Sequence, residues 1–265
     1  MKALILAGGF GTRLRPLSCT RPKLMFPVAN RPVIDWILEG LAKNGVKTVI
    51  LAVNYGADML LQHLGKTRFG MNILYSYENK PLGTGGPVKK AEKLLNEDKE
   101  PFFVLNGDVL SSIDYSALFQ SHKSNGAQAT MALHEVENPS RFGVVELNGH
   151  NQILRFIEKP KLEEAPSKLI NAGTYVLNRS VLGLIAPEAK ISMERDIFPI
   201  LASKGQLYGQ RFEGLWMDIG TPDDYLLANV AVLSIIASEK PFLGSDVEIS
   251  SEAKLIPPVA TGNRV

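Results

Sequence analysis

Short apolar runs alternate with segments of helical spacing through the first 105 residues, and this alternation constrains the fold most strongly. The runs expected to form buried strands are residues 2–7, 48–53, 72–77 and 102–105. The helices expected between them are residues 33–41, 58–64 and 88–95. Strands and helices that alternate at this spacing predict an α/β fold, with a mostly parallel sheet covered by helices on both faces.

The pattern changes in the second half of the chain. Residues 129–135, 143–147 and 153–158 are shorter and alternate apolar with polar side chains, which suggests an antiparallel extension of the sheet. Further strands are expected at residues 169–177 and 207–212. A helix is expected over residues 223–238, with Thr221 as its N-cap and Pro222 at its first position.

The last segment has a different composition and no helical period. Residues 239–265 place isolated apolar side chains among Ser, Gly and Pro. We interpret residues 1–238 as one domain and residues 239–265 as the truncated start of a repeating β-solenoid, whose repeat is near six residues. A frayed tail is the alternative, because a single solenoid coil cannot bury a core by itself.

Charge and cysteine content exclude several classes of protein. The net charge of +2 is too small for non-specific nucleic-acid binding. A single cysteine, Cys19, can form neither an intrachain disulfide nor a zinc site built from several cysteines, and it fits a reducing cytoplasm. The apolar runs are too short for a signal peptide or a membrane span. We therefore expect no nucleic acid and no membrane among the partners.

A glycine-rich loop with many cations follows the first strand. Its glycines are Gly8, Gly9 and Gly11, and its cations are Arg13, Arg15, Arg21 and Lys23. Glycines let the backbone approach a ligand and point N–H groups at phosphates. The loop does not match the Walker motif, and Leu14 stands where a dinucleotide fingerprint needs its third glycine. We interpret the segment as a polyphosphate pocket, with a tight turn bearing solvated arginines as the alternative.

Two aspartates stand where a metal could bind. Asp108 belongs to the segment Asn106-Gly107-Asp108-Val109, which directly follows the apolar strand at residues 102–105, and ligands bind at such strand ends in α/β folds. Asp218 lies among apolar residues just before a helix. If the two carboxylates converge, they form an oxygen site suited to Mg²⁺, although each alone is more typical of a turn or a cap.

Two further segments carry groups that suit a sugar phosphate and a base. Glu158 and Lys159, with Asn171 and Gly173 downstream, are the groups needed for sugar hydroxyls and a monophosphate, although a surface ion pair is the alternative. The glycine-rich loop at residues 78–87 could press its backbone against a flat base, although it could also be a plain loop.

These motifs together resemble the sugar-1-phosphate nucleotidyltransferases, over about residues 1–238. The most specific element is the signature G-G-x-G-T-R-L-x-P with a downstream P-K, met here by residues 8–16 and by Pro22-Lys23. The E-K-P, N-A-G and W-x-D-x-G elements follow in the family's order. Within the family the chain looks most like the mannose-1-phosphate guanylyltransferases, on stretches such as residues 81–87 and 102–108. The alternative is a glucose-1-phosphate uridylyl- or thymidylyltransferase.

The resemblance implies a Rossmann-like, GT-A-type fold that continues into a left-handed β-helix beginning at residues 239–265. It implies Mg²⁺ as cofactor, a homo-oligomer, and nucleoside triphosphate and hexose 1-phosphate as substrates. The implied products are a nucleoside-diphosphate sugar, here GDP-mannose made from GTP and mannose 1-phosphate, and pyrophosphate.

The family's site residues carry over where this sequence matches. The implied catalytic residues are Arg13, Lys23, Asp108 and Asp218, the last two as Mg²⁺ ligands. The implied nucleotide-binding residues are Leu6, Ala7, Gly8, Gly9, Gly11, Thr12, Arg13, Glu78, Gly83, Thr84, Asn106 and Gly107. The implied sugar-phosphate residues are Gly143, Glu158, Lys159, Asn171 and Gly173.

The implied reaction is an in-line attack by a sugar phosphate oxygen on the α-phosphorus. That nucleophile is already anionic, so the protein must position the reactants and neutralise charge. A rival hypothesis is a non-catalytic regulatory subunit that binds sugar nucleotides, but it would have lost Arg13, Lys23 or an aspartate. A dinucleotide oxidoreductase is disfavoured by Leu14 and by the absence of an acid after the second strand.

Overall fold

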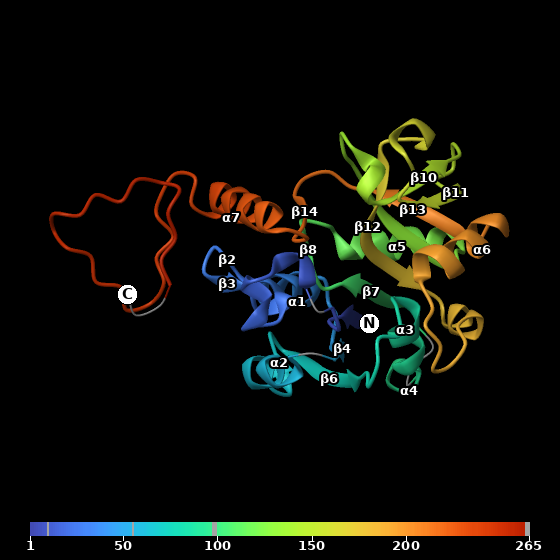
Figure 1. Cartoon of the computed structure of the whole chain (residues 1–265), viewed down its shortest axis with the longest axis horizontal. Coiled ribbons are helices and arrows are strands. Elements are labelled where there is room, and N and C mark those ends of the chain that lie inside the picture. Colours follow the sequence, from blue (N-terminus) through green and yellow to red (C-terminus); the bar gives the residue numbers. More distant parts are fainter. Residues whose placement is uncertain (10, 55, 97–99, 263–265) are drawn as a thin grey trace.

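A computed structural model describes residues 1–9, 11–54, 56–96 and 100–262, and one mixed sheet runs through its body (Figure 1). The strands of this sheet are β1 (Lys2–Leu6), β4 (Thr48–Val53), β5 (Thr67–Arg68), β6 (Met71–Tyr77), β7 (Phe102–Asn106), β9 (Ala129–Glu135), β10 (Gly143–Leu147), β11 (Ile153–Glu158), β12 (Leu169–Leu177) and β13 (Leu207–Arg211). Their order is β11-β10-β12-β7-β1-β4-β6-β5, with β9 paired to β12 and β13 to β9.

The sheet has two halves of different polarity. Strands β7, β1, β4 and β6 pair in parallel, with Leu6 opposite both Asn106 and Ala52. Strand β12 runs antiparallel to β7 and β9, and β10 and β11 extend this half. The carboxyl ends of the parallel strands meet at one edge, so the loops after β1, β6 and β7 gather there. The predicted mixed α/β sheet with an antiparallel extension is confirmed.

Helices cover both faces of the sheet. They are α1 (Val33–Lys43), α2 (Ala57–Leu64), α3 (Gly85–Lys90), α4 (Glu92–Leu95), α5 (Tyr115–Asn125), α6 (Phe198–Ser203) and α7 (Pro222–Ile236). Because successive strand side chains point to opposite faces, Ala3 and Ile5 of β1 join one core with α1, α2, α5 and α7, whereas Leu4 joins a second core with α3, α4 and α6. None of the described helices has the length and apolar content needed to cross a membrane.

Short elements complete the described chain. Two small ribbons pair β2 (Pro27–Val28) with β3 (Arg31–Pro32) and β8 (Val109–Ser111) with β14 (Trp216–Asp218). The 3₁₀ turns are Thr12–Leu14, Leu17–Cys19, Lys23–Met25, Pro139–Arg141, Leu162–Glu164 and Arg179–Leu184, and Met193–Ile197 is a π-helix.

Some expectations need correction. The helix expected at residues 88–95 begins earlier, at Gly85, and is interrupted at Ala91, whose ψ of 0° leaves the helical range. The final helix ends at Ile236 rather than at residue 238. The N-cap is confirmed, because the Thr221 hydroxyl accepts a hydrogen bond from the Asp224 N–H at 3.2 Å.

The C-terminal segment leaves the body beyond α7 and forms an extended loop (Figure 1). Within its described part, residues 239–262, the only strand-like pairing is one parallel bridge between Phe242 and Ala260. The Phe242 N–H donates to the Val259 carbonyl at 2.8 Å, and the Thr261 N–H donates to the Phe242 carbonyl at 2.9 Å. A single bridge does not confirm the expected β-helix start, which stays a prediction, and residues 263–265 lie outside the described chain.

Candidate active site

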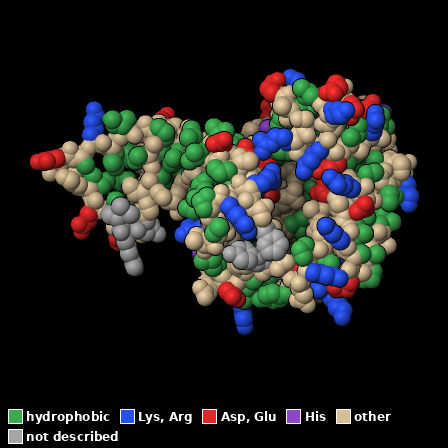
Figure 2. Space-filling view, viewed as in Figure 1, with side chains coloured by type: hydrophobic (Ala, Val, Ile, Leu, Met, Phe, Trp, Pro, Cys, Tyr) green, Lys and Arg blue, Asp and Glu red, His purple; other side chains and the backbone are tan. Residues whose placement is uncertain are grey.

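Two adjoining pockets open at the edge where the parallel strands end. The first, here called the glycine-loop pocket, lies between the loops that follow β1, β6 and β7. The second, here called the β11–β12 pocket, is lined by the last residue of β11 and by residues 171–173 of β12. Arg13, Thr84, Asn106 and Asp108 line both pockets. Figure 2 shows a hollow in the body of the protein with Lys and Arg side chains along its sides, which suits anionic ligands.

The glycine-loop pocket gathers most of the expected nucleotide-binding residues. Those that line it are Leu6, Gly8, Gly9, Gly11, Thr12, Arg13, Glu78, Gly83, Thr84 and Asn106. Ala7 and Gly107 do not line this pocket, and their backbone N–H groups instead bond to the neighbouring strands β4 and β1. The Ala7 N–H bonds the Ala52 carbonyl at 2.8 Å, and the Gly107 N–H bonds the Leu6 carbonyl at 3.1 Å. A side chain at position 107 would come within 2.7 Å of that Leu6 oxygen, so only glycine fits this crossing.

All five expected sugar-phosphate residues line the β11–β12 pocket. Glu158 and Lys159 are consecutive, and an extended strand would send their side chains to opposite faces. Lys159 instead has a φ of 51°, in the left-handed region that few side chains tolerate, and both residues line the same pocket. The Lys159 ammonium lies 3.6 Å from the Glu158 carboxylate.

Asn171 shapes the facing wall of this pocket. Its amide oxygen accepts from the Gly173 N–H at 2.9 Å, and its amide nitrogen donates to the Tyr175 hydroxyl at 2.8 Å. Gly173 has a φ of 74°, and a Cβ there would lie 2.9 Å from the Asn106 amide nitrogen. The Asn106 amide oxygen is buried without a hydrogen-bond partner in the described chain, as expected of a group that bonds a ligand.

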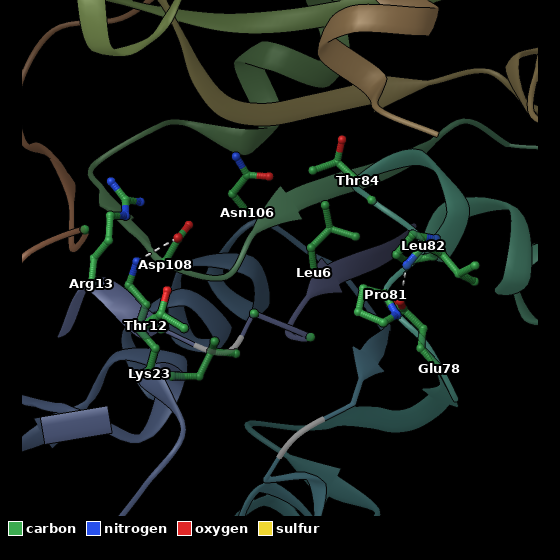
Figure 3. A pocket seen from close by; sticks show the side chains of 17 residues that line it. Leu6, Thr12, Arg13, Lys23, Glu78, Pro81, Leu82, Thr84, Asn106 and Asp108 are labelled. Atoms are coloured by element: carbon green, nitrogen blue, oxygen red, sulfur yellow. Dashed lines mark hydrogen bonds and ion pairs between the residues drawn. The ribbon is translucent and has the colours of Figure 1, made fainter. Parts of the chain in front are cut away.

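A lysine holds the two expected metal ligands together. The β8–β14 ribbon places Asp218 opposite Val109, and the Ile219 N–H bonds the Asp108 carbonyl at 2.9 Å. The Lys23 ammonium lies 2.7 Å from one Asp108 carboxylate oxygen and 3.8 Å from one of Asp218. Burial, and then repulsion by the Asp108 carboxylate, raise the pKa of Asp218. Figure 3 shows Lys23 joined to Asp108, with Arg13 on the same side of the pocket.

The chemistry of these oxygens fits Mg²⁺. Across the described ranges, no group of three or more His, Cys, Asp or Glu side chains could hold a metal alone. Magnesium does not need one, because it keeps several waters and is held by one or two carboxylates together with substrate phosphates. Asp108 and Asp218 supply two such carboxylates beside a pocket built for anions.

Glu78 lies at the other end of the glycine-loop pocket, beside Leu82 (Figure 3). The residue is 8% exposed, and burial raises its pKa. One carboxylate oxygen accepts from the Leu82 N–H at a long 3.4 Å. The other makes no hydrogen bond to the described chain and can accept from a ligand.

The loop after Glu78 is held against the segment before α6. The Gly85 N–H donates to the Ile191 carbonyl at 2.8 Å, and the Ile191 N–H donates to the Leu82 carbonyl at 3.0 Å. Gly83 has a φ of 77°, and a Cβ on it would overlap the Ile191 carbonyl oxygen. The loop is therefore a fixed wall of the pocket.

The Gly83→Ala variant tests this wall. We expect it to lose about 1–3 kcal/mol of unfolding free energy, because the methyl group meets a carbonyl and alanine disfavours a left-handed backbone. The matched control is Gly149→Ala, at an exposed turn where an added Cβ meets nothing within 4 Å and φ is not positive. Urea denaturation of the two variants gives the measurement, and equal stabilities would show that the loop is free to move.

Sequence reasoning missed several residues of the β11–β12 pocket. Arg141 and Phe142 line it without belonging to any motif, and Trp216, which does belong to one, was given no role. The Trp216 N–H bonds the Ala172 carbonyl at 3.1 Å and its ring meets Phe142 edge-on. Glu194 also lines the pocket from the π-helix, and no spacing in the sequence marks it.

Comparison with known proteins gives one family and a consistent set of relatives. The nucleotidyl transferase family model matches residues 2–235. The chain is 45% identical to the mannose-1-phosphate guanyltransferase of Yarrowia lipolytica, covering 91% of this chain and 66% of the relative. It is 44% identical to the Saccharomyces cerevisiae protein of the same name, covering 91% and 67%. The chain thus spans about two thirds of the length of these relatives.

Solved structures show the same fold. A putative glucose-1-phosphate thymidylyltransferase of Bacillus anthracis aligns with a TM-score of 0.79 at 25% identity, covering 87% of this chain and 94% of that one. HddC of Yersinia pseudotuberculosis, complexed with GMP-PN, aligns with a TM-score of 0.72 at 30% identity, covering 86% and 98%.

Proposed function

We propose, from the premise that this chain belongs to the nucleotidyl transferase family, that it transfers the guanylyl group of GTP to mannose 1-phosphate, forming GDP-mannose and releasing pyrophosphate. The names of relatives that match 91% of the chain at 44–45% identity support both substrates. The choice of mannose rests on those names. The choice of guanine rests in addition on Glu78, which is the observation that carries the proposal.

Glu78 suits guanine because of the groups that each base presents. A buried carboxylate with a free oxygen is an acceptor only. Guanine offers two adjacent donors on its pairing edge, N1–H and N2–H. Uracil and thymine offer one N–H between two carbonyl oxygens, which a carboxylate repels. The solved relative in complex with GMP-PN is consistent with a guanine nucleotide on this scaffold.

The proposed step balances without proton transfer. An anionic oxygen of mannose 1-phosphate forms a bond to the α-phosphorus of GTP, and the bond from that phosphorus to the bridging oxygen breaks, so pyrophosphate leaves. Arg13 and Lys23 oppose the repulsion of the two anions, which is about 4 kcal/mol for unit charges 4 Å apart at an effective dielectric of 20. Asp108 and Asp218 would hold Mg²⁺, which supplies positive charge to phosphate oxygens.

We further propose that the protein is cytoplasmic and forms a homo-oligomer. The one cysteine, exposed Cys19, fits a reducing cytoplasm. A homo-oligomer is supported by the apolar surface of α7, where Leu226, Leu227, Val230 and Ile235 are each about 60% exposed. Light scattering after gel filtration measures the assembly, and a monomer at micromolar concentration would contradict it.

Pyrophosphate release over a grid of substrates tests the reaction. The grid pairs GTP, UTP, dTTP and ATP with the 1-phosphates of mannose, glucose and N-acetylglucosamine, with Mg²⁺ present. We expect the highest kcat/KM with GTP and mannose 1-phosphate. A maximum at another pair would overturn the assigned substrates, and no release from a folded protein would overturn the transferase itself.

A further inference from the structure

Glu194, a carboxylate outside every sequence motif, accepts a hydrogen bond from Thr84, a residue that lines both pockets. Glu194 belongs to the π-helix Met193–Ile197 and lines the β11–β12 pocket. One of its carboxylate oxygens, Oε2, accepts hydrogen bonds from the Thr84 hydroxyl at 2.6 Å and from the Ser192 hydroxyl at 2.7 Å. Thr84 lies on the loop that follows Glu78 and lines both pockets. The hydrogen bond between Thr84 and Glu194 therefore links the glycine-loop pocket to the β11–β12 pocket.

The Thr84 hydroxyl has a fixed orientation in this arrangement. Its oxygen accepts a hydrogen bond from the Met193 N–H at 2.9 Å. A hydroxyl has one hydrogen to donate, and here it goes to Glu194. Because both hydrogen bonds that Glu194 receives from the described chain end on Oε2, its second oxygen is left to accept from a ligand.

The charges around Glu194 indicate the kind of ligand. Burial, and then repulsion by the Glu194 carboxylate, raise the pKa of Glu158, so two carboxylates act on the same pocket. Further negative charge is unfavourable for holding a phosphate, and the cations that line this pocket are Arg13, Lys159 and Arg141, of which Arg141 pairs with Asp224 at 2.9 Å. What an acceptor-only group needs is a donor, and the donors of a hexose 1-phosphate are its ring hydroxyls.

We propose, on the premise of the transferase reaction above, that Glu194 accepts a hydrogen bond from a hexose hydroxyl and is a specificity-determining residue of the sugar half of the site. Through its hydrogen bond to Thr84, the same carboxylate also holds the glycine-rich loop at residues 78–87. The contact with the hexose and the position of this loop therefore depend on one side chain. Glu194 touches substrate in this assignment, and Thr84 is a positioning residue.

The test pairs the Glu194→Gln variant with hexose 1-phosphates that each lack one hydroxyl. Glutamine keeps the shape and a carbonyl oxygen that can accept from Thr84, but it lacks the negative charge. With intact mannose 1-phosphate we expect kcat/KM to fall about 10- to 100-fold, as for loss of a hydrogen bond to a charged group. With the one deoxy sugar that lacks the contacted hydroxyl, we expect wild type and variant to agree within about twofold.

A structural role alone would give a different pattern. If Glu194 only fixed the loop, Glu194→Gln would lower the rates with all sugars by one common factor, and that result overturns the proposal, as does an unchanged rate. The matched control is Glu137→Gln, whose carboxylate pairs with Lys168 on the exposed surface and should leave every rate unchanged. Wild type that turns over no hexose 1-phosphate would overturn the transferase reaction itself, which separates the two failures.

The Thr84 link has its own readout. Thr84→Val removes the hydroxyl that bonds Glu194, whereas Thr84→Ser keeps it. We expect Thr84→Val to raise the KM for GTP and for hexose 1-phosphate together, and Thr84→Ser to restore both. In the double variant with Glu194→Ala, which removes the acceptor for the Thr84 hydroxyl, the losses of the two single variants should be less than additive, because each removes the same contact. Additive losses would overturn the link.

Discussion

Replacing Asp108 or Asp218 by asparagine is expected to lower the rate of pyrophosphate release by a hundredfold or more, on the order found when a key electrostatic group is lost. Both carboxylates converge on the Lys23 ammonium, at 2.7 and 3.8 Å, beside the glycine-loop pocket. Asparagine keeps their shape but removes the negative charge that would hold Mg²⁺. The measurement is steady-state turnover at saturating Mg²⁺, with circular dichroism to establish that each variant is folded.

Two controls make this result specific. Asp58→Asn alters an exposed aspartate in the first turn of α2, away from both pockets, and should leave turnover unchanged. Chelation of divalent metal should abolish turnover of the wild type, and Mg²⁺ should restore it. Near-normal turnover by both active-site variants would show that neither carboxylate holds a catalytic metal.

The strands of this protein could be predicted closely from the sequence because their signal is local. Four strands, β9 to β12, begin and end at the expected residues, since each is a continuous or alternating apolar run bounded by turn residues. Helix α5 was missed because its apolar side chains are few and the rest of its surface is polar. Its burial against the sheet, with Phe103 packed on Phe119 and Tyr115, is a tertiary effect.

The sequence could predict which local segments line the two pockets, but not how segments far apart in the chain approach one another. The glycine loop is a single local motif, and its three glycines, Arg13 and Lys23 line one pocket as expected, whereas Arg15 and Arg21 do not. The approach of Asp218 to Asp108 depends on the register of the β8–β14 ribbon, which joins segments far apart in the chain. Glu194 reaches the β11–β12 pocket from a π-helix that is likewise far along the chain from the strands of the pocket. No local sequence pattern distinguishes it from a surface glutamate.

Replacing Glu78 by glutamine is expected to change the base that the protein accepts. Glutamine offers one acceptor and one donor where the carboxylate offers acceptors only. It cannot accept both N–H groups of guanine, but it can accept from the N–H of uracil while donating to a neighbouring carbonyl. We expect kcat/KM with GTP to fall by on the order of a hundredfold, as for loss of a hydrogen bond to a charged group, and the preference for UTP over GTP to rise.

The same variant should be more stable than the wild type at neutral pH. Burial raises the pKa of Glu78, so the folded protein binds this proton more tightly than the unfolded chain. This difference in proton binding contributes to the free energy of unfolding at low pH, and the contribution is lost as pH rises through the raised pKa of Glu78. Above that pH the wild type carries a buried charge that Glu78→Gln lacks. Thermal melting without nucleotide should therefore favour the variant at pH 7 and show a smaller difference near pH 4.

Nucleotide binding should show the opposite dependence on pH. Ionised Glu78 accepts from guanine, whereas the protonated acid presents an O–H, so affinity for GTP should weaken as pH falls through the raised pKa of Glu78. The triphosphate titrates in a similar range, so the informative quantity is the ratio of wild-type to Glu78→Gln dissociation constants at each pH. This ratio should favour the wild type at high pH and approach one at low pH. A ratio that is constant with pH, together with unchanged base preference, would remove Glu78 from base recognition and leave GTP supported only by likeness to relatives.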